Sequence, residues 1–272
     1  MTTTTDPAAA TFAAEWEAWH ASRERYFRDP HGWVAITALH WLTPAPAPLG
    51  GGVPGRWSSA DGTVRIQAAR TDAVVLPDGT TVDGEATLHP VEGAPGLGVR
   101  VGDLLVEVAR RTSHDIVRVH DPRAPQLAEF TGIPAYAPDP AWVVPGVLTR
   151  YPAPRTVTTG AVVDGLEHHH TAIGTVDFAI GGAPQQLVVF DGAHGPSVLF
   201  RDATSGVTTY PASRTLALGP VADDGALLLD FNRAANLPCG LTQFATCPVP
   251  PRENVLTVAV EAGEQWVRPA DA

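Results

Sequence analysis

Polar residues that are rare elsewhere in the chain gather in its last quarter. All three Asn residues and both Cys residues lie between positions 232 and 254. They are Asn232, Asn236, Asn254, Cys239 and Cys247. The segment is too rich in Pro for regular structure, and a connection of this length inside a compact domain is usually functional or disordered. Its apolar residues, such as Phe231 and Phe244, argue against disorder.

Two interpretations of this segment compete. In the first, it forms one wall of a pocket: Asp230 or Glu261 acts as acid or base, and Cys239 is a nucleophile if a neighbouring base lowers its pKa. The three Asn side chains would then bind the substrate, with Asn232 and Asn236 orienting it or a water molecule. In the second, Asn and Asp cap turns and satisfy buried backbone groups, while the thiols pack as small apolar groups.

A hairpin just before this segment carries further groups that could bind a ligand. It runs from Phe200 to Arg214 and turns at Thr204-Ser205-Gly206. The polar side chains predicted to contact a substrate are those of Asp202, Thr204, Ser205, Tyr210 and Arg214. Amides and hydroxyls of such a turn can hold an anion, with Arg214 as the charged partner. The alternative is a plain hairpin in which Arg214 pairs with Asp202 on the surface.

His168 and His170 have a spacing that could place two ligands on one metal ion. On a strand, residues two apart face the same way, and imidazole is a common metal ligand. A third ligand is required, and the sequence identifies none, although His194, Asp191 and His114 are candidates. A polar start to a strand is the favoured interpretation. The sequence names no cofactor.

The composition excludes several classes of protein. The chain has 18 basic residues, all Arg, against 29 acidic ones, for a net charge of −11. The absence of Lys excludes Schiff-base chemistry and a phosphate-binding loop of the P-loop type. Acidic balance and scattered Arg argue against a nucleic-acid partner.

Neither a signal peptide nor a membrane-spanning run is visible, so we expect a cytoplasmic protein with no membrane partner. The two Cys are then expected as thiols, with a Cys239–Cys247 disulfide as the alternative. A small-molecule ligand is the expected partner. The sequence does not decide whether the protein forms a homo-oligomer.

These groups must be positioned by a mainly β structure. Residues 1–10 are expected to be a disordered tail and residues 11–29 an amphipathic helix with Phe12, Trp16, Trp19 and Phe27 near one face. Beyond it, Asp-Gly pairs separate short Val, Ile, Leu and Thr runs, which is typical of antiparallel hairpins. We predict a barrel- or sandwich-like fold of many short strands, Val255–Val260 among them. It forms a single domain over 11–272, unless a seam falls within the Pro-rich stretch 122–154.

The hairpin and the loop together resemble an uncharacterised prokaryotic family, domain of unknown function 1684. The matching residues are Phe200 through Arg214, Asp230-Phe231-Asn232 with Asn236 and Cys239, Cys247-Pro248 with Pro250-Pro251 and Glu253-Asn254, and Ala262-Gly263-Glu264. The resemblance extends to 32–42 and 110–121. Leu237 and Pro211 depart from the family pattern. The family has no activity to transfer, so the resemblance supports only the location of a site.

The favoured hypothesis is therefore an enzyme that acts on a small, anionic organic molecule between the 200–214 hairpin and the 230–254 loop. One alternative is a β-barrel that binds a small molecule without chemistry. Another is a metal-dependent hydrolase that uses His168 and His170.

Overall fold

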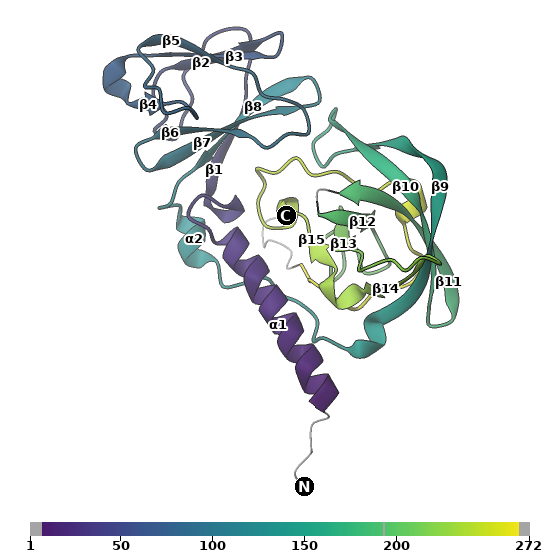
Figure 1. Cartoon of the computed structure of the whole chain (residues 1–272). Coiled ribbons are helices and arrows are strands. Elements are labelled where there is room, and N and C mark those ends of the chain that lie inside the picture. Colours follow the sequence, from purple (N-terminus) through teal and green to yellow (C-terminus); the bar gives the residue numbers. More distant parts are fainter. Residues whose placement is uncertain (1–6, 193, 267–272) are drawn as a thin grey trace. The chain divides into compact units, whose positions relative to one another are not determined.

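A computed structural model describes residues 7–192 and 194–266, and its chain divides into two compact units. Unit 1 comprises residues 1–24, 132–241 and 247–272, and unit 2 comprises residues 25–131 and 242–246. One boundary, between Thr131 and Gly132, lies inside the Pro-rich stretch 122–154. Figure 1 shows the helices and strands of each unit.

The first described element is one long helix, α1 (Pro7–Phe27), whose residues up to Glu24 belong to unit 1. Phe12, Trp16 and Trp19 are half-buried and Phe27 is buried, so the predicted stripe faces protein. The helix starts four residues earlier than expected. The predicted disordered tail thus falls on residues 7–10, which are helical, and on residues 1–6, which lie outside the described residues.

Unit 2 is built from two antiparallel sheets that share one apolar core. The larger sheet has the order β1-β8-β7-β6-β4 and the smaller one β2-β3-β5. The strands are β1 (Ile36–Trp41), β2 (Arg56–Ala60), β3 (Thr63–Ala68), β4 (Val74–Val75), β5 (Gly84–Leu88), β6 (Leu97–Val101), β7 (Leu104–Arg111) and β8 (His114–His120); the short helix α2 spans Pro125–Glu129. Trp57, Ile66 and Val106 are buried together between the sheets.

In the described part of unit 1, seven strands form one antiparallel sheet in the order β14-β9-β10-β11-β12-β13-β15. The strands are β9 (Val143–Gly160), β10 (Glu167–Ile180), β11 (Ala183–Gly192), β12 (Gly195–Phe200), β13 (Arg214–Ala217), β14 (Ala226–Asp230) and β15 (Ala235–Asn236). Gly181 and Gly182 join β10 to β11 with φ of +57° and +81°, as a tight two-residue hairpin turn requires. The hairpins predicted from turn residues are therefore confirmed here.

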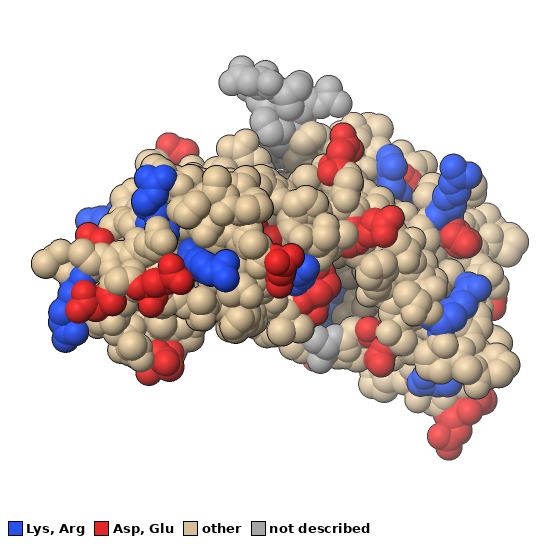
Figure 2. Space-filling view, turned by 90° about the horizontal axis from the view of Figure 1, so that it is seen from above, with Lys and Arg blue, Asp and Glu red and all other residues tan. Residues whose placement is uncertain are grey.

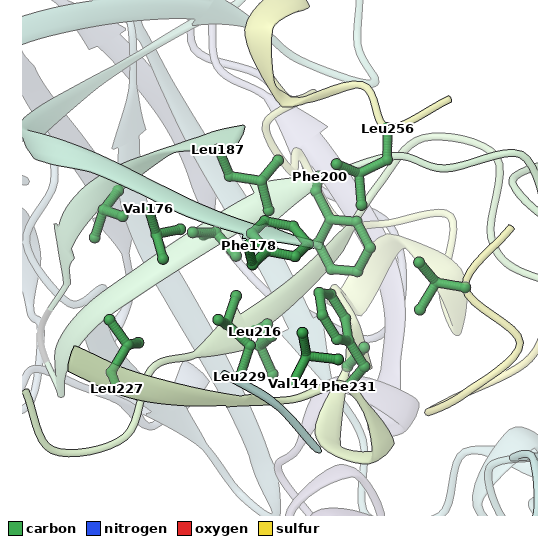
Figure 3. Packing of buried hydrophobic residues seen from close by; sticks show 14 of the residues in the cluster. Val144, Val176, Phe178, Leu187, Phe200, Leu216, Leu227, Leu229, Phe231 and Leu256 are labelled. Atoms are coloured by element: carbon green, nitrogen blue, oxygen red, sulfur yellow. The ribbon is translucent and has the colours of Figure 1, made fainter. Parts of the chain in front are cut away.

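The core of unit 1 lies against one face of this sheet. Figure 3 shows Phe178, Phe200 and Phe231 packed together among Leu and Val side chains. The ring centroids of Phe200 and Phe231 are 5.8 Å apart in an edge-to-face arrangement, which aromatic pairs favour. Phe231 stands at the start of the 230–254 segment, so this segment is anchored in the core.

Of the two alternatives expected for the fold, the sandwich is confirmed, and one expected strand is wrong. The sheets are sandwich-like and not closed into a barrel, because the edge strands β14 and β15 do not pair with each other in the described sheet. Val255–Val260 is not a strand: Val255 forms only an isolated bridge with Arg201. The backbone of this segment forms hydrogen bonds with groups outside a sheet. The amide of Val260, for example, donates to the Asp202 carboxylate at 3.2 Å.

No helix among the described residues is long and apolar enough to cross a membrane. Figure 2 shows acidic and basic side chains interspersed over the face in view, with no continuous basic stripe on it.

Candidate functional site

Arg214, predicted to hold an anion, is instead a buried member of an ion pair. Its Nη2 donates to Asp202 Oδ2 at 2.7 Å and to the Val260 carbonyl at 3.0 Å, while Nη1 donates to the carbonyl of Ala262. The pairing with Asp202 was the alternative expected from the sequence, but it lies in the interior rather than on the surface. The guanidinium therefore ties β13 to the 260–262 backbone.

Thr204 and Ser205 complete this network from the hairpin side. The Thr204 amide donates to Asp202 Oδ1 at 2.8 Å, and its hydroxyl is 2.8 Å from the hydroxyl of Thr209. Ser205 Oγ accepts from the Asp202 amide at 3.1 Å. The turn thus directs its polar groups to its own backbone and to Asp202, which favours a structural role.

Asn232 and Asn254 use their amides to pair with backbone of other segments. Asn232 accepts from the Asp139 amide at 2.8 Å and donates to the Asp139 carbonyl at 2.9 Å. Asn254, with 0% of its surface exposed, makes the same pair of bonds with Val188, at 2.7 and 2.9 Å, and also donates to the Leu199 carbonyl. Asn alone among small side chains offers both a donor and an acceptor in this geometry, which explains why it is retained here.

Asn236 belongs to a buried cluster that sequence reasoning missed. Glu264, 0% exposed, accepts from the Asn236 amide at 2.7 Å and from Arg23 Nη2 at 3.1 Å. Arg23 also donates to the Asn236 carbonyl at 3.0 Å, which fastens α1 to β15. The side-chain Oδ1 of Asn236 is buried without a hydrogen-bond partner. Glu264 stands in the Ala262-Gly263-Glu264 motif, the one available signal, but its partner in α1 is 241 residues away.

The two cysteines are neighbours and are not joined by a disulfide. The Cys239 amide donates to Cys247 Sγ at 3.3 Å. Interaction with the Cys247 thiol and with Tyr210 lowers the pKa of Cys239, although burial opposes this shift. Burial, and then Cys239, raises the pKa of Tyr210. A lowered thiol pKa favours oxidation and nucleophilic chemistry.

The predicted acid and base groups are not brought to this thiol. Asp230 caps the following turn by accepting from the Asn232 amide at 3.2 Å, and it pairs with Arg233 at 3.1 Å. Glu261 is exposed. Asp230 thus contacts Asn232 and Arg233, whereas Cys239 interacts with Cys247 and Tyr210, and these contacts do not join the predicted groups into one catalytic site.

His168 and His170 share a face of β10, as predicted, with ring centroids 6.2 Å apart. Burial, and secondarily the two neighbouring His residues, lowers the pKa of His170, and its Nε2 lies 3.0 Å from the Thr159 hydroxyl. Among the described residues no group of three His, Cys, Asp or Glu side chains is placed to hold a metal ion. The third ligand that the sequence failed to identify is therefore not supplied by the described fold.

A cavity of about 330 Å³ lies in unit 1 between α1 and one face of the sheet. We call it the Arg233 cavity. Its lining residues are Trp19, Arg23, Gly192, His194, Gly195, Ser197, Thr215, Ala217, Arg233 and Ala235. Ser197 pairs with Ala217 across β12 and β13, and Thr215 pairs with Ala235 across β13 and β15. Small side chains on these neighbouring strands leave a space, and α1 covers it.

The Arg233 cavity is bordered by two guanidinium groups that share one aromatic ring. The Cζ atoms of Arg23 and Arg233 each lie 5.9 Å from the ring centroid of Trp19. Asp230 holds Arg233 through Nε, and Glu264 holds Arg23. The carboxylates stand outside the lining, so the cavity is lined by cationic, hydroxyl and imidazole groups. Arg233 and Thr215 lie in or beside the predicted segments, whereas Trp19 and Arg23 come from the helix.

A larger groove of about 770 Å³ follows β9 and β14. Its lining is apolar apart from Asp177, whose carboxylate already accepts a hydrogen bond from Gln186 at 2.7 Å. It offers few groups that could orient a polar molecule, so the smaller cavity is the better candidate for a binding site.

These features define a β-rich protein in which a buried polar network supports a small cavity lined by Arg residues. The sequence profile described as Protein of unknown function (DUF1684) matches residues 128–265, about half of the chain, and the protein therefore belongs to this family. The resemblance drawn from the hairpin and loop motifs is confirmed. The matched range does not include the segments 32–42 and 110–121.

Comparison with solved structures gives an uncharacterized protein of Haloarcula marismortui, known from solution NMR. It is 29% identical, the alignment covers 52% of this chain and 79% of that chain, and the TM-score is 0.44. A comparison with curated proteins gives no match.

Proposed function

We propose that unit 1 binds a small organic anion, a carboxylate or a phosphate ester, in the Arg233 cavity. The observation that carries the proposal is the convergence of Arg23 and Arg233 on Trp19 at the cavity wall. Guanidinium groups bind carboxylate and phosphate with two parallel hydrogen bonds, and the planar fork loses little freedom on binding.

The carboxylates behind the cavity support this function by orienting the cations. Asp230 contacts Arg233 through Nε at 3.1 Å, so its predicted acid/base role is replaced here by a positioning role. Arg233 remains 39% exposed and is thus accessible to a ligand. The Ser197 hydroxyl and the His194 ring add polar groups along the same lining, whereas the Thr215 hydroxyl donates to the Val198 carbonyl at 3.2 Å.

The proposal is for binding rather than turnover. Of the three predicted catalytic residues, Asp230, Cys239 and Glu261, none lines the cavity. Binding of an anion requires only the geometry described.

Isothermal titration with benzoate and with phenyl phosphate tests the proposal. We expect Arg233→Gln to weaken binding by about ten- to a hundredfold, because it removes a charge-assisted contact. The matched control is Arg252→Gln, another exposed Arg of unit 1 that does not line the cavity. Affinity should also fall as salt is raised. Equal affinity in both variants, or no binding of either anion to the unaltered protein, would contradict the proposal.

A further inference from the structure

The larger groove of unit 1, which follows β9 and β14, has an apolar surface where the alternation along its strands predicts polar residues. On β14, Leu227 and Leu229 are buried in the core, as Figure 3 shows, whereas Leu228 is 56% exposed. Successive side chains of a strand point to opposite faces, and the outward positions of such a strand are usually polar. Leu228 therefore presents apolar surface outward, and we call this groove the Leu228 groove.

The neighbouring strand β9 extends this apolar surface. Leu228 pairs with Pro145, and Ala226 pairs with Val147. Directly opposite residues of adjacent strands project to the same face of a sheet, and Val147 is 49% exposed. Residues 219–222, which are Gly, Pro, Val and Ala, add to the same lining. At about 770 Å³, the groove has the size of sites that bind small organic molecules, and it can cover the hydrocarbon part of one.

One carboxylate lies beside the apolar surface. Asp177 on β10 pairs with Val147, so its exposed side chain projects to the same face as the groove. The Gln186 Nε2 donates to Asp177 Oδ1 at 2.7 Å, which restrains the carboxylate and leaves Oδ2 able to accept from a ligand. Of the described residues that line the groove, Asp177 is the one that carries a charge. The groove is therefore apolar with a single negative group.

These features determine the kind of ligand that the Leu228 groove suits. An apolar body would remove Leu228 and Val147 from water, which is favourable and needs few polar contacts. A positive charge near Asp177 would be attracted, whereas an anion would be repelled. The net charge of the chain, −11, acts in the same direction. A molecule that joins a hydrocarbon body to a cationic group meets both requirements.

We propose that unit 1 binds a hydrophobic amine in the Leu228 groove, with its apolar body against β9 and β14 and its ammonium group at the Asp177 carboxylate. This ligand is opposite in charge to the one proposed for the Arg233 cavity, and the described linings of the two sites share no residue. The inference therefore stands apart from the proposed anion binding, and each can fail without the other.

Isothermal titration of the full-length protein with 4-phenylbutylamine and with 4-phenylbutanol tests the charge preference. The two ligands have the same apolar body, and at neutral pH the first carries an ammonium group where the second carries a hydroxyl. We expect the amine to bind about three- to fivefold more tightly, because an ion pair with an exposed carboxylate is modest in strength. Raising the salt concentration should weaken binding of the amine and not that of the alcohol.

Variants of Asp177 identify the carboxylate. In Asp177→Asn the affinity for the amine should fall to that for the alcohol, while the affinity for the alcohol stays the same. The matched control is Glu253→Gln, which removes another exposed carboxylate of unit 1 that does not line the groove. This variant should bind both ligands as the natural protein does. A preference for the amine that persists in Asp177→Asn would contradict the assigned role of this residue and with it the proposal.

A glycine variant locates the apolar part of the site. Gly219 lines the groove, and a Cβ there would contact the carbonyl oxygen of Leu228 at 3.7 Å, an ordinary van der Waals distance. Gly219→Leu should therefore fold, fill part of the groove and weaken both ligands by about tenfold or more. The matched control is Gly160→Leu, outside the lining, whose Cβ would contact a side-chain carbon of Val249 at 3.7 Å. It should bind both ligands normally.

Sedimentation of the natural protein and of Leu228→Arg tests whether a second copy of the chain covers the groove instead. We expect both proteins to sediment with the same mass. A dimer that is present in the natural protein and lost in Leu228→Arg would overturn the proposal. Equal affinity of the natural protein for amine and alcohol, no binding of the amine, or unchanged affinity in Gly219→Leu would overturn it as well.

Discussion

Arg214 and Asp202 form an ion pair of 2.7 Å whose side chains are only 1% and 0% exposed. The pair joins the start of β13 to the turn after β12, and Arg214 extends it to the backbone at 260–262. Both terminal nitrogens of Arg214 donate to protein acceptors and its Nε is buried without a partner, so the guanidinium is closed off from ligands, and we assign anion binding to the partly exposed Arg233 instead.

The first prediction concerns this pair. Arg214→Met should lower the free energy of unfolding by about 3–5 kcal/mol, because Asp202 would be left as a buried charge without its partner. Urea denaturation followed by circular dichroism measures the change. Arg252→Met, at an exposed position, should have little effect. A melting temperature unchanged in Arg214→Met would show that the pair is not structural.

The second prediction concerns the amide of Asn254. Asn254→Ala leaves the amide and carbonyl of Val188 and the carbonyl of Leu199 without their partner, so we expect a loss of several kcal/mol. Asn254→Asp should be worse at neutral pH, since a carboxylate would face two carbonyl oxygens. Thermal unfolding of both variants checks the order. If the Asp variant were as stable as the natural protein, the assigned donors would be wrong.

The third prediction is that Cys239 and Cys247 form a disulfide on mild oxidation. Hydrogen peroxide takes two electrons and two protons from the thiols and is reduced to water. The lowered pKa of Cys239 supplies the attacking thiolate. Intact-mass measurement should show the loss of two hydrogens, reversed by dithiothreitol. Cys247→Ser should instead accumulate a sulfenic acid at Cys239, and persistent free thiols in the oxidised natural protein would refute the prediction.

The fourth prediction concerns acid stability. The pKa of Glu107 falls from 4.5 to about 2 in the folded protein. Its contribution to stability is therefore complete above pH 4.5 and is lost as the pH falls toward 2; it amounts to about 3 kcal/mol.

In Glu107→Gln this contribution should be absent at neutral pH, and the difference from the natural protein should vanish near pH 2. Urea denaturation at a series of pH values measures it. A difference that stays constant across the acid range would mean that the carboxylate charge is not responsible.

Local features of the sequence were sufficient to predict much of the fold. Gly181-Gly182 and the Asp-Gly pairs predict hairpins because a tight turn depends on the residues that occupy it and on their immediate neighbours. The stripe of Phe12, Trp16 and Trp19 predicts the buried face of α1 for the same reason. Val255–Val260 has the composition of a strand, yet a strand also needs a partner, and here the Asp202 side chain and loop backbone take that place.

The sequence by itself determined the β class, the family and the importance of the 230–254 segment, since rare Asn and Cys residues mark it directly. Only the tertiary structure decided what those residues do. Asn254 finds Val188 66 positions away, and Arg23 meets Glu264 across 241 positions. Hydrogen-bond partners at such separations are chosen by how sheet and helix pack, and no local pattern encodes them. The same packing buries Arg214 in an ion pair with Asp202 and places Arg233 at the wall of the Arg233 cavity.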